Sequence, residues 1–168
     1  DGSPLVMDCF NSSITLGKKA FLYANSFGSP QLRDAWKAME VKKNPSLQGK
    51  RFSNPVVTNA LTHGLRITAE LFAGTNDKVV VPDWDNYALV FEEAVGAKLE
   101  LFNTFKDGAF DVEAMKSALL AEGDKKLLIL NFPDNPTGYT ATNADAAANV
   151  AAEKEAADTG KKIVVILD

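Results

Sequence analysis

Two asparagines stand where an apolar stretch of the sequence gives way to turn residues. Residues 127–130 (LLIL) form a continuous apolar run, typical of a strand buried on both faces of a parallel sheet. Pro136 cannot donate to a strand ladder, and Gly138 permits backbone conformations that other residues avoid. Asn131 and Asn135 are therefore presented where the strand ends. In open α/β sheets ligands bind at that edge, although Asn, Pro and Gly are also ordinary turn residues.

A strand that leads directly into a helix is predicted further upstream. Residues 55–58 (PVVT) favour a short strand, and a helical apolar pattern begins at Thr62 and ends at Gly74. Such a junction directs backbone N–H groups and the positive end of the helix dipole at one point, which suits a phosphate group. We interpret His63, on the first helical turn, as a packing or capping residue rather than a catalytic one.

An aromatic side chain and a carboxylate follow two other predicted strands. Trp84 follows the strand 79–81 after Pro82 and Asp83, a position from which an indole can stack on a cationic heterocycle. Asp168 follows the predicted strand 162–167. A core aromatic and an acid in solvent are the simpler interpretations of these two residues. Their places at strand ends favour ligand binding for both.

Several motifs at these positions resemble those of the class I/II aminotransferases, the fold-type I enzymes that use pyridoxal 5′-phosphate (PLP). N-x-P-x-N-P-T-G at residues 131–138 resembles the family's PLP-binding segment, and P-x-W-x-N-Y at 82–87 resembles its ring-stacking segment. T-N-A-L-T-H-G-L at 58–65 is similar to its phosphate loop, although the family often has Gly or Ser in place of the second and third residues. Y-x-x-x-x-G-x-P-x-L-R at 23–33 resembles the segment that precedes the large domain.

The resemblance implies a role in binding PLP for seven residues. Ala60, Leu61 and Thr62 hold the phosphate, Trp84 stacks on the ring, Asn135 donates to the phenolic O3′, Asp168 binds the pyridine nitrogen, and Tyr23 reaches the phosphate of the neighbouring subunit. Asp168 is the catalytic residue among them, because a carboxylate beside the ring nitrogen favours the pyridinium form that acts as an electron sink. For Tyr23, simple packing at a helix entrance is an equal alternative.

The order of the elements predicts an α/β fold with three α/β/α layers and a mainly parallel sheet. Strands are predicted at residues 55–58, 79–81, 98–102, 127–130 and 162–167, and helices at 30–43, 62–73, 87–95, 112–120 and 143–158. Asp111 is the predicted cap of the fourth helix, and Thr142 with Asp145 resembles a capping box for the last. We assign residues 1–22 to an N-terminal arm or loop and 23–168 to an incomplete PLP-transferase-like large domain.

The function implied is that of a homodimeric aminotransferase, which moves an amino group between an amino acid and a 2-oxo acid. In the family the Schiff-base lysine lies beyond the residue matched by Asp168, while Lys161 and Lys162 precede the final strand at its other end. The chain also starts without Met, so we expect a piece of a longer protein that is inactive alone. A C–S lyase or decarboxylating enzyme of the same fold, or a non-catalytic α/β fragment that binds a phosphorylated ligand, are the alternatives. No G-x-G-x-x-G follows a strand, which disfavours a dinucleotide domain.

The composition of the chain argues against several classes of binding partner and ligand. A net charge of −4 with scattered lysines argues against nucleic acid. No apolar run is long enough to span a membrane, and no signal peptide is recognised at the start. A single cysteine, Cys9, permits no internal disulfide, and one histidine argues against a zinc cluster, so no metal is expected. A cytoplasmic setting fits these features best.

Overall fold

The computed structural model describes residues 22–83 and 87–168, which belong to two compact units. One unit runs as far as Val57, and the other is Thr58–Asp168. The arm predicted at residues 1–22 lies outside the described residues except for Leu22, and its boundary with a domain at 23–168 stays a prediction. Within the described residues, no helix is long and apolar enough to cross a membrane.

The unit Thr58–Asp168 is built on a four-stranded sheet in which all neighbouring strands are parallel. Its strands are β1 (Lys78–Pro82), β2 (Lys98–Phe102), β5 (Lys125–Leu130) and β6 (Lys162–Leu167). They lie in the order β2-β1-β5-β6, so β5 is paired on both sides, with Leu127 beside Val79 of β1 and Val164 of β6. The apolar run 127–130 therefore forms an interior strand, as predicted.

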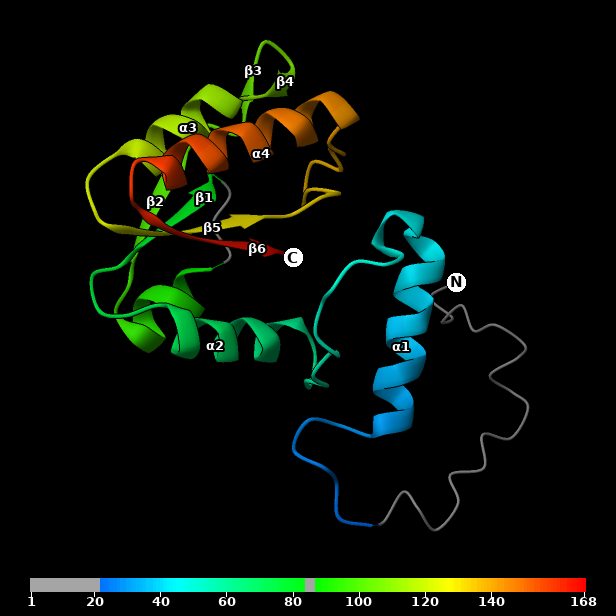
Figure 1. Ribbon diagram of the computed structural model, residues 1–168. Coiled ribbons are helices and arrows are strands. Elements are labelled where there is room, and N and C mark those ends of the chain that lie inside the picture. The colour runs from blue at the N-terminus through cyan, green and yellow to red at the C-terminus, as the bar shows by residue number, and fades with distance from the viewer. Residues whose placement is uncertain (1–21, 84–86) are drawn as a thin grey trace, which may run out of the picture. The chain divides into compact units, whose positions relative to one another are not determined.

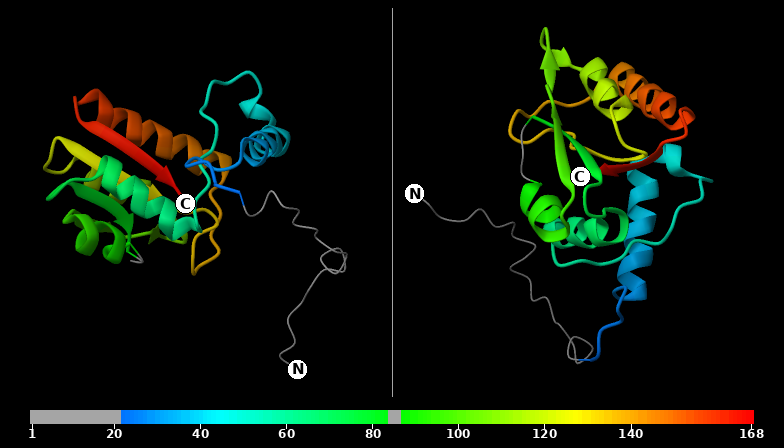
Figure 2. Two further views of the ribbon diagram at one scale, coloured as in Figure 1. Left: turned by 90° about the horizontal axis from the view of Figure 1, so that it is seen from below. Right: turned by 90° about the vertical axis from the view of Figure 1, so that its left-hand side faces the viewer.

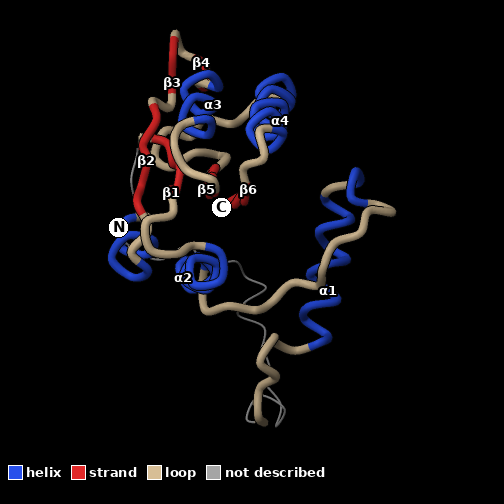
Figure 3. The backbone as a smooth tube through the Cα atoms, turned by 60° about the vertical axis from the view of Figure 1, so that its left-hand side comes forward, coloured by secondary structure: helices blue, strands red, loops and turns tan. Residues whose placement is uncertain are grey.

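Helices cover both faces of this sheet, which confirms the predicted three-layer α/β/α arrangement (Figure 1). Helices α3 (Val112–Leu120) and α4 (Asn143–Asp158) cover one face. Helix α2 (Leu61–Phe72) and the π-helical segment Leu89–Glu93 cover the other. The right view of Figure 2 and Figure 3 show the strands between these two sets of helices from other directions.

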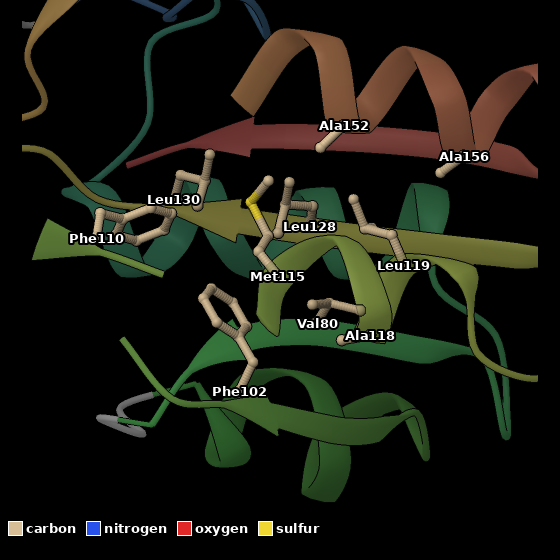
Figure 4. Close-up of a cluster of buried hydrophobic side chains, with 10 residues drawn as sticks. All are labelled: Val80, Phe102, Phe110, Met115, Ala118, Leu119, Leu128, Leu130, Ala152 and Ala156. Atoms are coloured by element: carbon tan, nitrogen blue, oxygen red, sulfur yellow. The ribbon is translucent and has the colours of Figure 1, made fainter. Parts of the chain in front are cut away.

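Side chains alternate between the two faces along the interior strands, so each helical layer has its own core. Val80 and Leu128 belong to the core under α3 and α4, while Val79 and Leu127 belong to the core under α2. Figure 4 shows the first of these cores, whose buried members are Val80, Phe102, Phe110, Met115, Ala118, Leu119, Leu128, Leu130, Ala152 and Ala156. Because both faces are buried, the central residues of the interior strands β1 and β5 carry no polar alternation.

Two helix starts were predicted from their capping residues, and both predictions are confirmed. Asp111 Oδ1 accepts a hydrogen bond of 2.9 Å from the backbone N–H of Ala114 at the start of α3. At the start of α4, Thr142 Oγ1 accepts from the N–H of Asp145, whose carboxylate accepts in turn from the N–H of Thr142. Asp thus replaces Glu in a working capping box, which satisfies two backbone donors that the helix itself leaves unpaired.

Two local predictions differ from the structure. The strand predicted at 55–58 is wrong, because this segment is irregular, and Val57 N–H donates to the carbonyl of Phe27 without a neighbouring ladder. Conversely, an antiparallel hairpin of β3 (Phe105–Lys106) and β4 (Ala109–Phe110) was not predicted. Its signal is the Asp107-Gly108 pair, whose φ angles of 51° and 80° belong to a tight two-residue hairpin turn.

The unit that ends at Val57 contains α1 (Pro30–Lys43) and a 3₁₀ turn at Pro45–Leu47. The predicted helix is confirmed, with Pro at its first position, yet none of its residues is buried. Gly28, at φ 94°, permits the close approach of Val57, since a Cβ at this position would lie 2.2 Å from Val57 Cγ2. Arg33 Nε donates to the carbonyl of Pro55 and adds a second link within this unit.

Candidate functional site

Three strand ends meet at one edge of the sheet. Because β1, β5 and β6 are parallel, the residues that follow them lie along the same edge, where Figure 1 also shows the C-terminal Asp168. Asp83 follows β1, Asn131 follows β5 and Asp168 follows β6. The Thr104 hydroxyl donates to the Asp83 carboxylate, which ties the segment after β1 to the segment after β2. The edge therefore carries polar groups on a rigid support.

Asp168 is fixed at this edge by both its backbone and its side chain. Its N–H donates to the carbonyl of Leu130 at 2.9 Å, which extends the pairing of β6 with β5 by one residue. Its Oδ2 accepts a hydrogen bond of 2.9 Å from the hydroxyl of Tyr87. Burial raises the pKa of the Tyr87 hydroxyl far above its ordinary value, and the hydrogen bond to Asp168 raises it further. The phenol therefore stays protonated and donates to the carboxylate.

Asn135 lies in a turn that is closed by its own hydrogen bonds. The N–H of Asp134 donates to the carbonyl of Tyr139 at 2.8 Å, and the N–H of Gly138 donates to the carbonyl of Asp134 at 2.7 Å. Thr137 Oγ1 donates to Asp134 Oδ2 at 2.5 Å. Asp134 is buried by these contacts, whereas Asn135 is exposed, and its bond to Pro136 is cis. The turn thus presents the Asn135 side chain outward after β5.

The start of α2 carries the third group of polar atoms. Helix α2 leads into β1, so it runs opposite to that strand and its N-terminal end lies toward the edge where the strands end (Figure 1). Ala60 occupies the cap position at φ 74° and ψ 170°, and its side chain offers no cap to the first-turn N–H groups. Thr62 is exposed on that turn. His63 Nδ1 accepts from the N–H of Asn59 at 3.0 Å, which agrees with a capping role.

The conformation of Ala60 leads to a testable expectation. A backbone at φ 74° and ψ 170° is almost restricted to glycine, because a Cβ is strained there by about 1–3 kcal/mol. Ala60→Gly removes this strain but adds freedom to the unfolded chain, so we expect a net gain of about 1 kcal/mol in the free energy of unfolding. Denaturant titration measures this change.

Ala73→Gly, at the other end of α2, is the matched control. Ala73 has φ −105°, where a Cβ causes no strain, so the same substitution should lower the free energy of unfolding by about 0.5–1 kcal/mol. Equal losses for both variants would show that Ala60 is unstrained in solution.

Two of the sequence-derived site residues cannot be related to this edge. Trp84 lies outside the described residues, so its predicted stacking stays a prediction. Tyr23 belongs to the unit that ends at Val57, where it is 96% exposed. The structure therefore gathers Asp168, Asn135 and the Thr62 turn toward one edge of a single unit. Tyr87, which contacts Asp168, was not singled out from the sequence, since nothing local relates residues that lie 81 positions apart.

Comparison with known proteins identifies the family of this chain. The model of the aminotransferase class I and II family matches residues 5–156. The chain belongs to this family. Among curated proteins, the aspartate aminotransferase of Musicola paradisiaca (strain Ech703) is 27% identical over 125 residues, which cover 73% of this chain and 31% of that protein.

Solved structures of aminotransferases share the fold. An aminotransferase from Anaerococcus prevotii matches with a TM-score of 0.76 and 23% identity, covering 88% of this chain and 37% of its own length. The alanine aminotransferase from Pyrococcus furiosus matches with a TM-score of 0.71 and 23% identity, covering 88% of this chain and 36% of its own. The chain thus spans about a third of the length of these relatives. The predicted family and its large-domain fold are confirmed.

Proposed function

We propose that this chain supplies the cofactor-binding part of a PLP-dependent aminotransferase. Class I and II aminotransferases generally depend on PLP, and the donor set at the sheet edge fits that group. The observation that carries the proposal is Asp168, a carboxylate held at the end of β6 by a neutral donor. An ionised carboxylate stabilises a protonated pyridine nitrogen, whereas a solvent-facing acid would need no such support.

The start of α2 supports a site for the cofactor's phosphate. The first-turn N–H groups of a helix have no partner within the helix, and the helix dipole favours an anion at this end. The cap residue Ala60 contributes no side-chain acceptor, so those donors remain suited to a ligand. The Thr62 hydroxyl is exposed on the same turn and adds a further donor. In the proposal Ala60, Leu61 and Thr62 hold the phosphate.

The remaining contacts fix the ring. In the proposal the exposed amide of Asn135 donates to the phenolic oxygen, and Trp84 stacks on one face. PLP, when bound, supplies an electron sink for a carbanion at the substrate Cα. The chain's own groups hold the ring nitrogen protonated, orient the ring and exclude water from its face.

Substrates and partners of the whole protein are part of the same proposal. They are an amino acid and a 2-oxo acid, with a second copy of the subunit whose phosphate site Tyr23 reaches. The almost complete exposure of Tyr23 agrees with a role outside its own unit. The proposal includes a cytoplasmic location. The resemblance implies a Schiff-base lysine beyond Asp168, so we also expect this stretch to be inactive alone.

Binding of pyridoxamine 5′-phosphate tests the proposal, because this form lacks the aldehyde that reacts with surface lysines. Equilibrium dialysis should show saturable binding by the chain, and pyridoxamine without phosphate should bind much more weakly. Thr62→Val removes one donor to the phosphate and keeps the side-chain shape. We expect its Kd to rise about 10–100-fold, because a hydrogen bond to a charged group contributes about 1.5–3 kcal/mol.

Thr75→Val is the matched control, since Thr75 is an exposed threonine just beyond the opposite end of α2. Its Kd should equal that of the wild type. Asn135→Ala should weaken the binding of pyridoxamine 5′-phosphate by about the same factor as Thr62→Val. Absence of binding to the wild type, or equal affinity for the phosphorylated and unphosphorylated ligands, would reject the proposed function.

A further inference from the structure

A hydrogen bond joins two segments that the sheet separates. Tyr87 lies just beyond β1, and Asp168 follows β6, while β5 lies between those strands. The Tyr87 hydroxyl reaches Asp168 Oδ2 at 2.9 Å, and the tyrosine is only 8% exposed. Its ring belongs to the buried core that also contains Phe91 and Ile129, so packing restricts the position of the ring. The donor is therefore preorganised.

The arrangement engages one oxygen of the carboxylate and fixes its direction. The Asp168 backbone is paired with Leu130, so only rotation of the side chain remains to be restricted. Tyr87 restricts it by holding Oδ2, and the second oxygen, Oδ1, is left for another donor. In the part of the chain that the structure describes, no lysine, arginine or histidine forms an ion pair with Asp168.

The chemical nature of the donor matters. A lysine or arginine would neutralise the carboxylate and repel a cationic ring, whereas a phenol donates without carrying charge. Burial raises the pKa of Tyr87, and so do the hydrogen bond and charge of Asp168 and the charge of Asp134. The hydroxyl thus remains a neutral donor at physiological pH, and the full negative charge of Asp168 is kept for the ligand.

We infer that Tyr87 is a positioning residue for the cofactor: it holds Asp168 by Oδ2 so that Oδ1 faces the protonated nitrogen of a cationic heteroaromatic ring. This inference rests on the proposed function, since it assigns the partner of Oδ1 to that ring. In this inference Asp168 binds the ring nitrogen, and Tyr87 supports Asp168 without touching the cofactor. Loss of the Tyr87 hydroxyl should therefore act on the ring nitrogen only through Asp168.

Tyr87→Phe tests this with a readout at the ring nitrogen. The chain is saturated with pyridoxamine 5′-phosphate carrying ¹⁵N in the ring, and the ¹⁵N shift is followed against pH. In Tyr87→Phe we expect the proton affinity of the bound ring nitrogen to fall about fivefold, so that its titration midpoint moves to lower pH. In an Asp168→Asn background, Tyr87→Phe should have no further effect.

Tyr139→Phe is the control, because the Tyr139 hydroxyl also donates to a carboxylate, Asp145, at 2.8 Å. It should leave the ring nitrogen unchanged. Labelling with 3-fluorotyrosine probes the contact between Tyr87 and Asp168 without a substitution. The inference can therefore be tested even if Tyr87→Phe does not fold. The chain has three tyrosines, and the ligand should shift the ¹⁹F signal of Tyr87 but not that of Tyr139.

Different results would reject the proposed function and the positioning role of Tyr87. If the wild type does not bind pyridoxamine 5′-phosphate, the proposed function is rejected and this inference with it. If the wild type binds, but neither the ring nitrogen in Tyr87→Phe nor the ¹⁹F signal of Tyr87 responds, only the positioning role is rejected. An equal effect of Tyr87→Phe with and without the Asp168 carboxylate would also reject it.

Discussion

Glu100→Leu is expected to lower the free energy of unfolding by about 3 kcal/mol, because it leaves a buried ammonium group without its partner. The Lys126 side chain is completely buried on β5, and its Nζ lies 2.5 Å from Glu100 Oε2 on β2. Strand β1 lies between these strands, so the lysine reaches across it. The Glu100 side chain is 27% exposed, and this contact with water places the expected loss at the lower end for a broken buried pair.

A second substitution, at Lys126, separates the cost of an unpaired buried charge from the cost of lost packing. Lys126→Met in the Glu100→Leu background removes the unpaired charge and fills the same space with an apolar chain, so most of the lost stability should return. Glu100→Gln keeps an acceptor for the ammonium group and should cost less than Glu100→Leu. Denaturant unfolding of Glu100→Leu, Lys126→Met and the double variant gives the coupling free energy between the two residues directly.

An exposed ion pair provides the control. Lys154 and Asp158 form an i,i+4 pair on α4 with side chains 72% and 65% exposed, and Asp158→Asn should change stability by less than about 0.5 kcal/mol. If Glu100→Leu changed stability as little as Asp158→Asn does, the lysine would have to reach solvent in the folded chain.

Local signals predicted most of the fold because each is physically sufficient on its own. The apolar run 127–130 requires burial on both faces, and the caps at Asp111 and Thr142 satisfy backbone donors that have no other partner. The strand at 55–58 failed for the opposite reason. A strand needs a neighbour, and the apolar residues of this segment are not paired along a ladder in the described part of the chain.

The candidate site was predictable to the level of strand ends, and no further. The end of a parallel strand is visible in sequence, so Asn135 and Asp168 could be assigned to one edge before the structure was known. The contact between Tyr87 and Asp168 was not predictable, since it depends on the strand order that brings the ends of β1 and β6 to the same region. The strained backbone of Ala60 was hidden too, because alanine by itself indicates ordinary helix.

Leu127→Ala and Leu128→Ala are each expected to lower the free energy of unfolding by about 3 kcal/mol, although they are neighbours on one strand. Both side chains are fully buried, Leu127 in the core under α2 and Leu128 in the core under α3 and α4. Truncation of a buried leucine removes its transfer free energy and leaves a cavity, which typically costs 2–5 kcal/mol. In a sheet with one face exposed to solvent, only one of two adjacent residues would show this loss of stability.

Leu101→Ala on β2 is the control, since Leu101 is 53% exposed and its truncation should cost less than about 1 kcal/mol. Thermal or denaturant unfolding of the three variants distinguishes the two kinds of sheet. Large, similar losses at both neighbours require helices packed on both faces of β5 in solution. A near-neutral result at either neighbour would instead mean that one helical layer is not packed against the sheet, and the edge that carries Asp168 would then lack the rigid support that the proposed function needs.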